Sequence, residues 1–390
     1  MRKFRFHVLG VPHTRTNLDY VACAYTQKAL KFCKMMTERG HTVYHYGVEG
    51  SDPVCTENVV VVSNEVYNRV YGEHDFHSKF FRFDTDDECY QTFYRNAIEE
   101  ISKREGDYDI ILPFWGAGVR PICDALADRF IIVEPGIGYG EGMWADYKAF
   151  ESYSIYHAYC GLQGVSYCNQ NNYDVVIPNY FDVNDFEYND NSDNSRFEDP
   201  YFLFVGRVYE GKGVHIAIQV CQALGVKLKI AGQLGDEYAD QNFGDNIEFI
   251  GYVNKEQRSN LMKNAIASFL PSQYVEPFGG VQIENLLCGT PTITSDWGAF
   301  AENNIEGVTG YRCRTFNDYL NAALSCYNKE ISYADCRAQG LKFTLEAVAP
   351  KYEKFFNDIV NIYQNNGWYH IEEETQTKAF EVLGRKIVDQ

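Results

Sequence analysis

The segment 206–213, Gly-Arg-Val-Tyr-Glu-Gly-Lys-Gly, combines turn-forming glycines with two cations, Arg207 and Lys212. The apolar run at 201–205 that precedes it predicts a buried strand. The run at 215–224, which ends at Gly225, predicts a helix. A strand-to-helix turn leaves N–H groups unpaired at the positive end of the helix, where an anion binds well. The two cations would add charge-assisted hydrogen bonds, so the segment predicts a phosphate-binding loop.

Two other interpretations apply to the same segment. Residues 206–212 fit the spacing G-x-x-x-x-G-K of a P-loop, whose next residue must be Ser or Thr in order to hold Mg²⁺. That residue is Gly213, which disfavours a nucleotide hydrolase. The second alternative is a surface loop with two solvated cations, because Lys and Arg are mostly exposed.

A second group of candidate residues comprises Glu276 and Glu284, with Gly279 and Gly280 between them. A helix is predicted over 281–288, and eight helical positions span roughly 12 Å at about 1.5 Å per residue. That span approaches the length of a nucleoside linked to a sugar through a diphosphate. Carboxylates repel phosphate but accept hydrogen bonds from sugar hydroxyls, whereas glycine amides can approach a diphosphate closely. Glu284 would therefore hold a ribose and Glu276 a hexose. One capping acid and one exposed acid on a helix is the alternative.

The elements that must position these residues alternate between strand and helix. In the first half, strands are predicted at 4–9, 41–46, 59–62, 109–112, 130–133 and 174–177, with a helix over 20–37. In the second half, strands are predicted at 201–205, 227–230, 247–250, 267–270 and 292–294. Such alternation predicts parallel βαβ units, hence an α/β protein of two doubly wound domains. The polar stretch 182–200 is the best linker candidate.

Composition excludes several classes of function. The 390 residues carry 35 basic and 54 acidic side chains, a formal net charge of −19, which disfavours nucleic acid as a partner. Twelve cysteines contain no C-x-x-C pair, so no metal site is predicted, and they are interpreted as buried free thiols of a reducing compartment. No run of 18 apolar residues occurs and the first ten residues resemble a strand, so a cytoplasmic protein without stable membrane insertion is expected.

A family resemblance follows from the joint spacing of several motifs. They are Glu276-Pro-Phe-Gly to Glu284, Cys288-Gly-Thr-Pro-Thr-Ile293, Gly298, Glu302, and Gly-Val-Thr-Gly-Tyr at 307–311. Upstream stand Ile-Ala-Gly at 230–232, Phe-Ile-Gly-Tyr-Val at 249–253, and Val-Ile-Pro-Asn-Tyr-Phe-Asp at 176–182. Together with 206–213 they resemble the retaining glycosyltransferases of family 4, glycosyl transferases group 1. The similarity covers residues 174–312.

The resemblance implies a GT-B fold, in which two Rossmann-like domains face a central cleft. It divides the chain into an acceptor domain (1–182), a linker (183–199), a donor domain (200–345) and C-terminal helices that return to the first domain (346–390). The apolar spacing of Tyr352, Phe355, Phe356, Ile359, Ile362 and Tyr363 fits such a returning helix, which is predicted to start after Ala349-Pro350.

The resemblance also implies a reaction: metal-independent, retaining transfer of a hexose or pentose from a UDP- or GDP-sugar to a hydroxyl of a glycan, glycoprotein or glycolipid. No further cofactor is expected. By this resemblance Arg207 and Lys212 hold the donor diphosphate, Glu284 the ribose and Glu276 the sugar. Gly206, Gly279, Gly280 and Tyr252 complete the donor site.

The first half departs from the common family pattern, because Gly-Val-Pro-His-Thr at 10–14 stands where many members have a Gly-Gly loop. His13 follows the first strand, where ligands gather in doubly wound sheets, and is a catalytic candidate; an ordinary loop histidine is the alternative. His157 is a second candidate by position alone, against a structural histidine on a helix face. The glycine-rich segment 134–142 is interpreted as an acceptor loop, or else as a structural turn.

Two alternative functions remain at this point. A nucleotide-sugar epimerase would share the GT-B layout, and a nucleotide-sugar-binding subunit would have lost catalysis. The intact set Arg207, Lys212, Glu276 and Glu284 favours transfer. The sequence selects neither the donor base and sugar nor the acceptor, the linkage formed or the oligomeric state.

Overall fold

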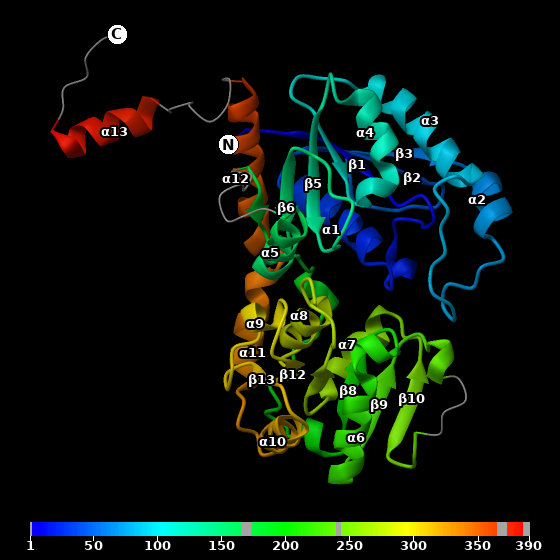
Figure 1. The fold of residues 1–390 in the computed structure, drawn as a ribbon, viewed down its shortest axis with the longest axis vertical. Helices are drawn as coiled ribbons and strands as arrows, with labels where there is room; N and C mark the ends of the chain where they lie inside the picture. The colour runs from blue at the N-terminus through cyan, green and yellow to red at the C-terminus, as the bar shows by residue number, and fades with distance from the viewer. Residues whose placement is uncertain (1, 165–172, 239–242, 365–372, 385–390) are drawn as a thin grey trace.

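The computed structural model describes residues 2–164, 173–238, 243–364 and 373–384. Two α/β domains lie one above the other, and each is built on a parallel sheet (Figure 1). The predicted fold class, two doubly wound domains, is confirmed.

The N-terminal sheet has seven parallel strands in the order β3-β2-β1-β4-β5-β6-β7. Their bounds are β1 (Arg5–Leu9), β2 (Thr42–Val48), β3 (Glu57–Val62), β4 (Ile110–Pro113), β5 (Ile131–Ile137), β6 (Tyr147–Phe150) and β7 (Val175–Val176). The chain order reverses between β1 and β4. In doubly wound sheets such a switch point is where ligands bind, beyond the carboxyl ends of the strands.

The C-terminal sheet repeats this order over six parallel strands, β10-β9-β8-β11-β12-β13. Their bounds are β8 (Phe202–Val205), β9 (Leu228–Ala231), β10 (Ile247–Gly251), β11 (Ser268–Leu270), β12 (Thr292–Ser295) and β13 (Gly310–Cys313). Its switch point lies between β8 and β11. The loops that follow these two strands contain Arg207, Lys212 and Glu276.

Helices cover both faces of each sheet (Figure 1). In the first domain they are α1 (Ala24–Glu38), α2 (Asn64–Tyr71), α3 (Glu88–Ser102), α4 (Arg120–Leu126) and α5 (Tyr153–Leu162). In the second they are α6 (Val214–Leu224), α7 (Lys255–Asn264), α8 (Gly280–Leu287), α9 (Phe300–Asn303), α10 (Phe316–Tyr327) and α11 (Tyr333–Gly340). Two further helices follow, α12 (Leu345–Gln364) and α13 (Glu373–Leu383).

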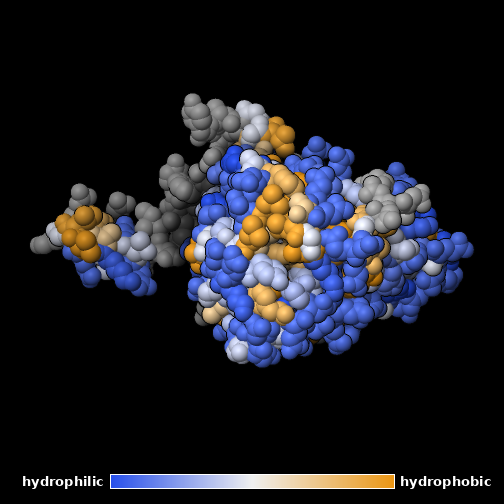
Figure 2. Space-filling model, turned by 90° about the horizontal axis from the view of Figure 1, so that it is seen from below, coloured by the Kyte–Doolittle hydropathy of each residue, from blue (hydrophilic) through white to orange (hydrophobic). Residues whose placement is uncertain are grey.

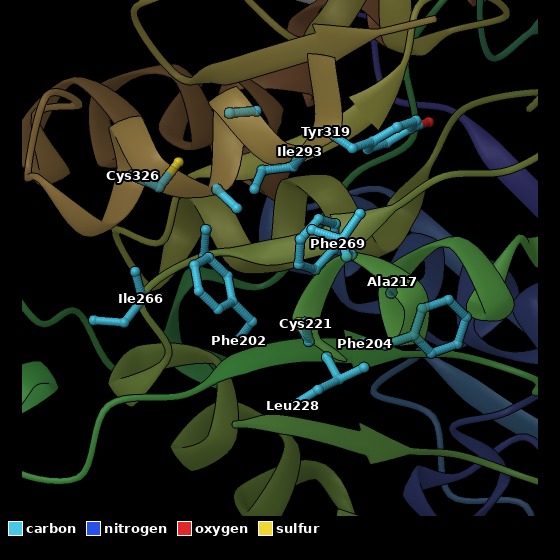
Figure 3. Close-up of a cluster of buried hydrophobic side chains, with 14 of the residues drawn as sticks. Phe202, Phe204, Ala217, Cys221, Leu228, Ile266, Phe269, Ile293, Tyr319 and Cys326 are labelled. Atoms are coloured by element: carbon cyan, nitrogen blue, oxygen red, sulfur yellow. The ribbon is translucent and has the colours of Figure 1, made fainter. Parts of the chain in front are cut away.

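Alternation along the central strands divides each core into two layers. In β1, Phe6 and Val8 pack on the side of α1 and α12, whereas Leu9 packs on the side of α2, α3 and α4. Successive strand residues point to opposite faces, so a strand covered on both sides buries side chains in both layers. The same division places Phe202 and Phe204 of β8 in the cluster drawn in Figure 3 and leaves Leu203 on the other face.

Helix α12 returns to the N-terminal domain, as predicted. Tyr352, Phe356 and Ile359 are buried against β1 and α1, and the Phe356 ring lies 4.8 Å from that of Phe6. Two details of the prediction are wrong. The helix begins at Leu345 and contains Pro350, because Thr344 caps its first turn before the proline. Tyr363 is 51% exposed, so the buried stripe does not extend to it.

The chain passes between the domains twice, and the two passages lie side by side. The Phe181 amide donates to the Phe343 carbonyl at 2.9 Å, and the Leu345 amide donates to the Phe181 carbonyl at 2.9 Å. Phe181 and Thr344 form a parallel bridge. The two crossings are therefore joined by backbone hydrogen bonds.

The polar segment predicted as a linker is attached to the C-terminal domain through Arg196. Its guanidinium is fully buried and donates to the carbonyls of Ala265 (2.5 Å), Asn189 (2.9 Å) and Cys288 (3.1 Å), and to the Thr290 hydroxyl (2.7 Å). A buried guanidinium requires several acceptors, and four are present. The boundaries 183 and 199 stay predictions.

Helix α13 lies apart from both domains in Figures 1 and 2. Val382 and Leu383 at its end are 85% and 62% exposed. Within the described ranges, no helix is long and apolar enough to cross a membrane. Every cysteine in those ranges is a free thiol, as predicted, but Cys55 and Cys160 are only partly buried; Cys168 lies outside the described residues.

Candidate active site

The phosphate-loop candidate leaves β8 at Gly206, makes a 3₁₀ turn (η5, Glu210–Lys212) and enters α6 through Gly213. Gly213 has φ +71°, and a Cβ at this position would lie 2.0 Å from the Pro271 carbonyl oxygen. The close approach of the next loop therefore requires the same glycine that disfavours a P-loop in the sequence. Helix α6 ends at Gly225, as predicted.

Lys212 and Glu276 meet at the switch point. The Lys212 ammonium lies 2.9 Å from Glu276 Oε2, which also accepts a 2.9 Å hydrogen bond from the Ser272 hydroxyl. Glu276 is 8% exposed. A nearly buried carboxylate needs such partners, and the ammonium retains two further N–H donors for a ligand. The fold therefore pairs a cation and an anion from two loops that lie 64 residues apart along the chain.

The amino end of α8 supplies the second half of the site. Gly279 is the N-cap with φ +79°, Gly280 is the first helical residue, and Glu284 follows one turn later. The Arg258 guanidinium of α7 donates to Glu284 Oε2 at 2.6 Å. This bond fixes the carboxylate of Glu284 and leaves lone pairs for hydroxyl groups.

These elements enclose one side of a cavity of about 280 Å³ between the domains. The predicted donor residues Gly206, Arg207, Lys212, Tyr252, Gly280 and Glu284 all line it. Residues of the N-terminal domain, including Ala24, Gln27 and Lys31, form the opposite wall. Gly279 and Glu276 are not part of the lining: a Cβ on Gly279 would lie 2.5 Å from the Phe300 ring, and Glu276 pairs with Lys212. A volume near 300 Å³ suits a small-molecule ligand.

A segment between α2 and α3 reaches across to the C-terminal domain. The Gln233 side-chain amide donates to the Phe76 carbonyl at 2.5 Å and the Lys79 carbonyl at 3.1 Å. Arg207 is exposed, and its guanidinium carbon lies 5.4 Å from the centre of the Phe80 ring. The Tyr252 hydroxyl donates to the Asp19 carbonyl at 3.0 Å. The domains are thus in direct contact around the cavity.

The structure places His13 in a buried aromatic cluster. The residue is 4% exposed, and its ring is hydrogen-bonded to the Tyr90 hydroxyl at 2.7 Å and packs edge-on against Trp115 at 5.1 Å. Burial lowers the pKa of His13 to about 3, so the imidazole is neutral near pH 7. His13 is not part of the cavity lining, and its catalytic role stays a prediction.

His157 lies on the exposed side of α5, with its ring 5.8 Å from Tyr153 and 5.7 Å from Tyr156. It does not line the cavity, and its catalytic role also stays a prediction. The same helix is held by Glu302 of the other domain. The Glu302 carboxylate accepts from the Tyr153 amide at 2.9 Å and from the Ser154 amide and hydroxyl at 2.6 Å.

The glycine-rich segment 134–142 is organised by Glu134. This fully buried carboxylate accepts hydrogen bonds from the Tyr139 hydroxyl (2.9 Å) and from the amides of Trp144 (2.8 Å) and Ala145 (2.9 Å). The loop therefore has a defined internal structure. Its contact with an acceptor stays a prediction.

Sequence reasoning missed three cations in the cavity wall: Lys31, Lys255 and Arg258. Lys255 pairs with Asp185 and Arg258 with Glu284. None belongs to a glycine-rich motif, so no local signal marked them. In the part of the chain that the structure describes, no three His, Cys, Asp or Glu side chains are arranged to hold a metal ion.

Comparison with known proteins gives a family match for the C-terminal half. Residues 185–342 match the family model of glycosyl transferases group 1. A glycogen synthase of Mycobacterium tuberculosis is 37% identical over 122 residues, 28% of this chain and 29% of that protein. A lipopolysaccharide 1,2-N-acetylglucosaminetransferase of Salmonella typhimurium is 26% identical over 217 residues, 46% and 55% of the two chains. The matches therefore span well under two thirds of these relatives.

Solved structures match over nearly the whole chain. Sucrose-phosphate synthase of Thermosynechococcus elongatus has a TM-score of 0.66 at 16% identity, covering 92% of this chain and 99% of that one. HepE of Anabaena, in complex with UDP and glucose, has a TM-score of 0.65 at 14% identity, covering 91% and 99%. At such identities the likeness establishes the fold. Residues 185–342 therefore carry the sequence pattern of glycosyl transferases group 1, and the two domains together have the GT-B fold.

Proposed function

We propose that this protein is a retaining, metal-independent glycosyltransferase of family 4 that moves a sugar from a nucleoside-diphosphate sugar to an acceptor hydroxyl. The observation that carries the proposal is the cavity between the domains. There Arg207, Lys212 and the first residue of α8 face the same space as Glu284. Cations and a helix amino end suit a diphosphate, and a carboxylate suits a sugar diol.

Each end of the donor has a matching group in this proposal. Glu284, fixed by Arg258, accepts hydrogen bonds from the ribose hydroxyls. Glu276 lies at the switch point beside Lys212, where it accepts hydrogen bonds from the transferred sugar. Arg207 and Lys212 hold the diphosphate between them. Tyr252 and Gly206 line the remaining wall.

The reaction transfers one glycosyl group. The bond between the anomeric carbon and the diphosphate oxygen breaks, and its electron pair goes to that oxygen. The acceptor oxygen bonds to the anomeric carbon on the same face, and its proton passes to the departing diphosphate. The products are a glycoside and a nucleoside diphosphate. The protein's contribution is to stabilise the charge that develops on the leaving oxygen, for which Lys212 and Arg207 are placed.

The comparisons support this proposal at the level of chemistry. The Anabaena structure contains UDP and glucose, and several relatives are named for glycosyl transfer. Their donors and acceptors differ from one another. Experiment must therefore identify the base and sugar of the donor and the acceptor.

The test is turnover of a donor panel. UDP- and GDP-linked hexoses and pentoses are incubated with the purified protein and a set of hydroxyl-bearing sugar acceptors, with and without EDTA, and released nucleoside diphosphate is measured. Release that persists in EDTA is expected, and the anomeric configuration of the first glycoside product, read by NMR, should match the donor. Binding without release would leave a non-catalytic subunit. An epimerised sugar, either free or still attached to the nucleotide, would identify an epimerase.

A further inference from the structure

The N-terminal domain supplies one cation to the donor cavity. Lys31 projects from α1 into the cavity wall, and its ammonium lies 4.3 Å from the centre of the Phe181 ring. Phe181 in turn lies at the amino end of α8: a Cβ on Gly280 would be 3.5 Å from the Phe181 ring. Lys31 is therefore adjacent to the helix end at which the diphosphate is proposed to bind.

Lys31 differs from most other cations of the cavity in having no carboxylate partner. Lys212, Lys255 and Arg258 are engaged by carboxylates. No ion pair or hydrogen bond joins the Lys31 ammonium to another residue in the described ranges, and the same holds for Arg207. A half-buried ammonium without a counter-charge is costly in a protein, unless a ligand supplies the charge.

The surrounding charges fit an anionic ligand. Burial is the main cause that lowers the pKa of Lys31 to about 8, and Lys28 on the same helix lowers it further. Glu284, Asp185 and Glu151 oppose the change but do not cancel it. The other charged residues of the cavity wall are Asp182, Arg207, Lys212, Lys255 and Arg258. An approaching diphosphate would therefore stabilise the charged form of Lys31.

We infer that Lys31 is a donor-binding residue that contacts the diphosphate from the N-terminal domain, opposite Arg207 and Lys212. The inference rests on the proposed function, because it takes the ligand of the cavity to be a nucleoside diphosphate. It adds a contact that the glycine-rich motifs of the C-terminal domain do not supply. Donor binding is then divided between the two domains.

The experiment measures affinity by calorimetric titration with UDP, GDP and ADP, and with the monophosphate and nucleoside of whichever binds best. Lys31→Met is expected to weaken diphosphate binding about 10-fold, because a charge-assisted contact is lost. Nucleoside binding should change less than about 2-fold. Lys351→Met is the matched control, since Lys351 is an exposed lysine of α12 that does not line the cavity.

The pH dependence separates charge from packing. Wild-type affinity for the diphosphate should fall as pH rises from 7.5 to 9.5, because free Lys31 loses its proton through this range. Lys31→Arg should bind at pH 7.5 and lose most of this decline, since a guanidinium stays charged. The diphosphate affinity of Lys31→Met should likewise change little over this pH range, but it should be lower than that of the wild type at pH 7.5.

Two results would overturn the inference while leaving the proposed function intact. One is equal diphosphate affinity in wild type and Lys31→Met at both pH values. The other is an equal loss for nucleoside and diphosphate, which would show a packing role. If the wild type binds none of the three diphosphates, the donor site and this inference fail together.

Discussion

At the scale of single residues, variants of Lys212 and Glu284 should affect donor binding, whereas a variant of Glu276 should affect donor turnover. Lys212→Ala and Glu284→Ala are expected to weaken nucleoside diphosphate binding about 10- to 100-fold, because each removes a charged hydrogen-bonding group. Glu276→Gln should leave diphosphate affinity within a few-fold and lower the rate of donor turnover. Titration and turnover on the same preparations check both.

Glu256→Gln is the control for these variants, since Glu256 is exposed in the first turn of α7. Its affinity should equal that of the wild type. If the wild type and the Lys212, Glu276 and Glu284 variants all bind the nucleoside diphosphate with the same affinity, the proposed site is wrong.

Gly213 provides a stability prediction at the same scale. Gly213→Ala should lower the free energy of unfolding by about 2 kcal/mol or more, because left-handed strain adds to the clash with the Pro271 carbonyl. Gly225→Ala at the other end of α6 has φ +65° but no atom within 4 Å of the added Cβ, so about 1 kcal/mol is expected. Urea titrations measure both, and equal losses would contradict the role of the Pro271 contact.

The sequence predicted those residues of the candidate site that lie close together along the chain, in one turn or at one helix end. Gly206, Arg207 and Lys212 belong to one strand-to-helix loop, and Gly280 and Glu284 to one helix end. Lys31 was not predictable, because only folding brings α1 to residues about 250 positions away. Arg258 meets Glu284 from another helix for the same reason.

At the scale of elements, α12 is expected to hold the N-terminal core together. Phe356→Ala should cost about 3–5 kcal/mol of unfolding free energy, because the ring is fully buried between β1 and α1. Tyr363→Ala on the exposed end of the same helix should change it by less than about 0.5 kcal/mol. Chemical denaturation of both variants tests this, and a small effect of Phe356→Ala would argue against docking.

Eleven strands were predicted, whereas β6 and β13 were missed. Both missed strands are four residues long and contain a cation, Lys148 and Arg312. The predicted strand β9 also contains a cation, Lys229, so the cation alone does not account for the failure. Lys148 is nevertheless buried and lies 3.4 Å from Asp174, so tertiary pairing compensates for the polar residue. The start of α12 was mispredicted because a Thr344 cap outweighs the missing N–H of Pro350.

At the scale of the whole molecule, Glu302 should help to hold the domains together. Its carboxylate lies at the positive amino end of α5 in the opposite domain, so Glu302→Ala should favour more open arrangements. Small-angle scattering of the nucleotide-free protein should give a larger radius of gyration for this variant. Glu306→Gln, which affects contacts with Arg312 in its own domain, should not change it.

An unchanged radius in Glu302→Ala would show that other contacts suffice, such as those of Gln233 and Tyr252. The two-domain plan itself was predictable, because strand and helix signals alternate twice along the chain. The arrangement of the two halves was not, since Gln233 and Glu302 act across distances of about 150 residues.

The paired crossings at Phe181 and Thr344 determine how the molecule can move. Because backbone hydrogen bonds join the two connections, we expect them to act as a hinge that permits rotation of the domains but resists sliding. The cavity borders these crossings, because Phe181 is part of its lining, and Lys31 and Arg207 line it from the two domains. A rotation at the crossings would therefore open and close the cavity. A small rotation at the crossings would change the distance between the Lys31 ammonium and the Arg207 guanidinium. That distance would therefore measure how far the two domains have closed around the diphosphate.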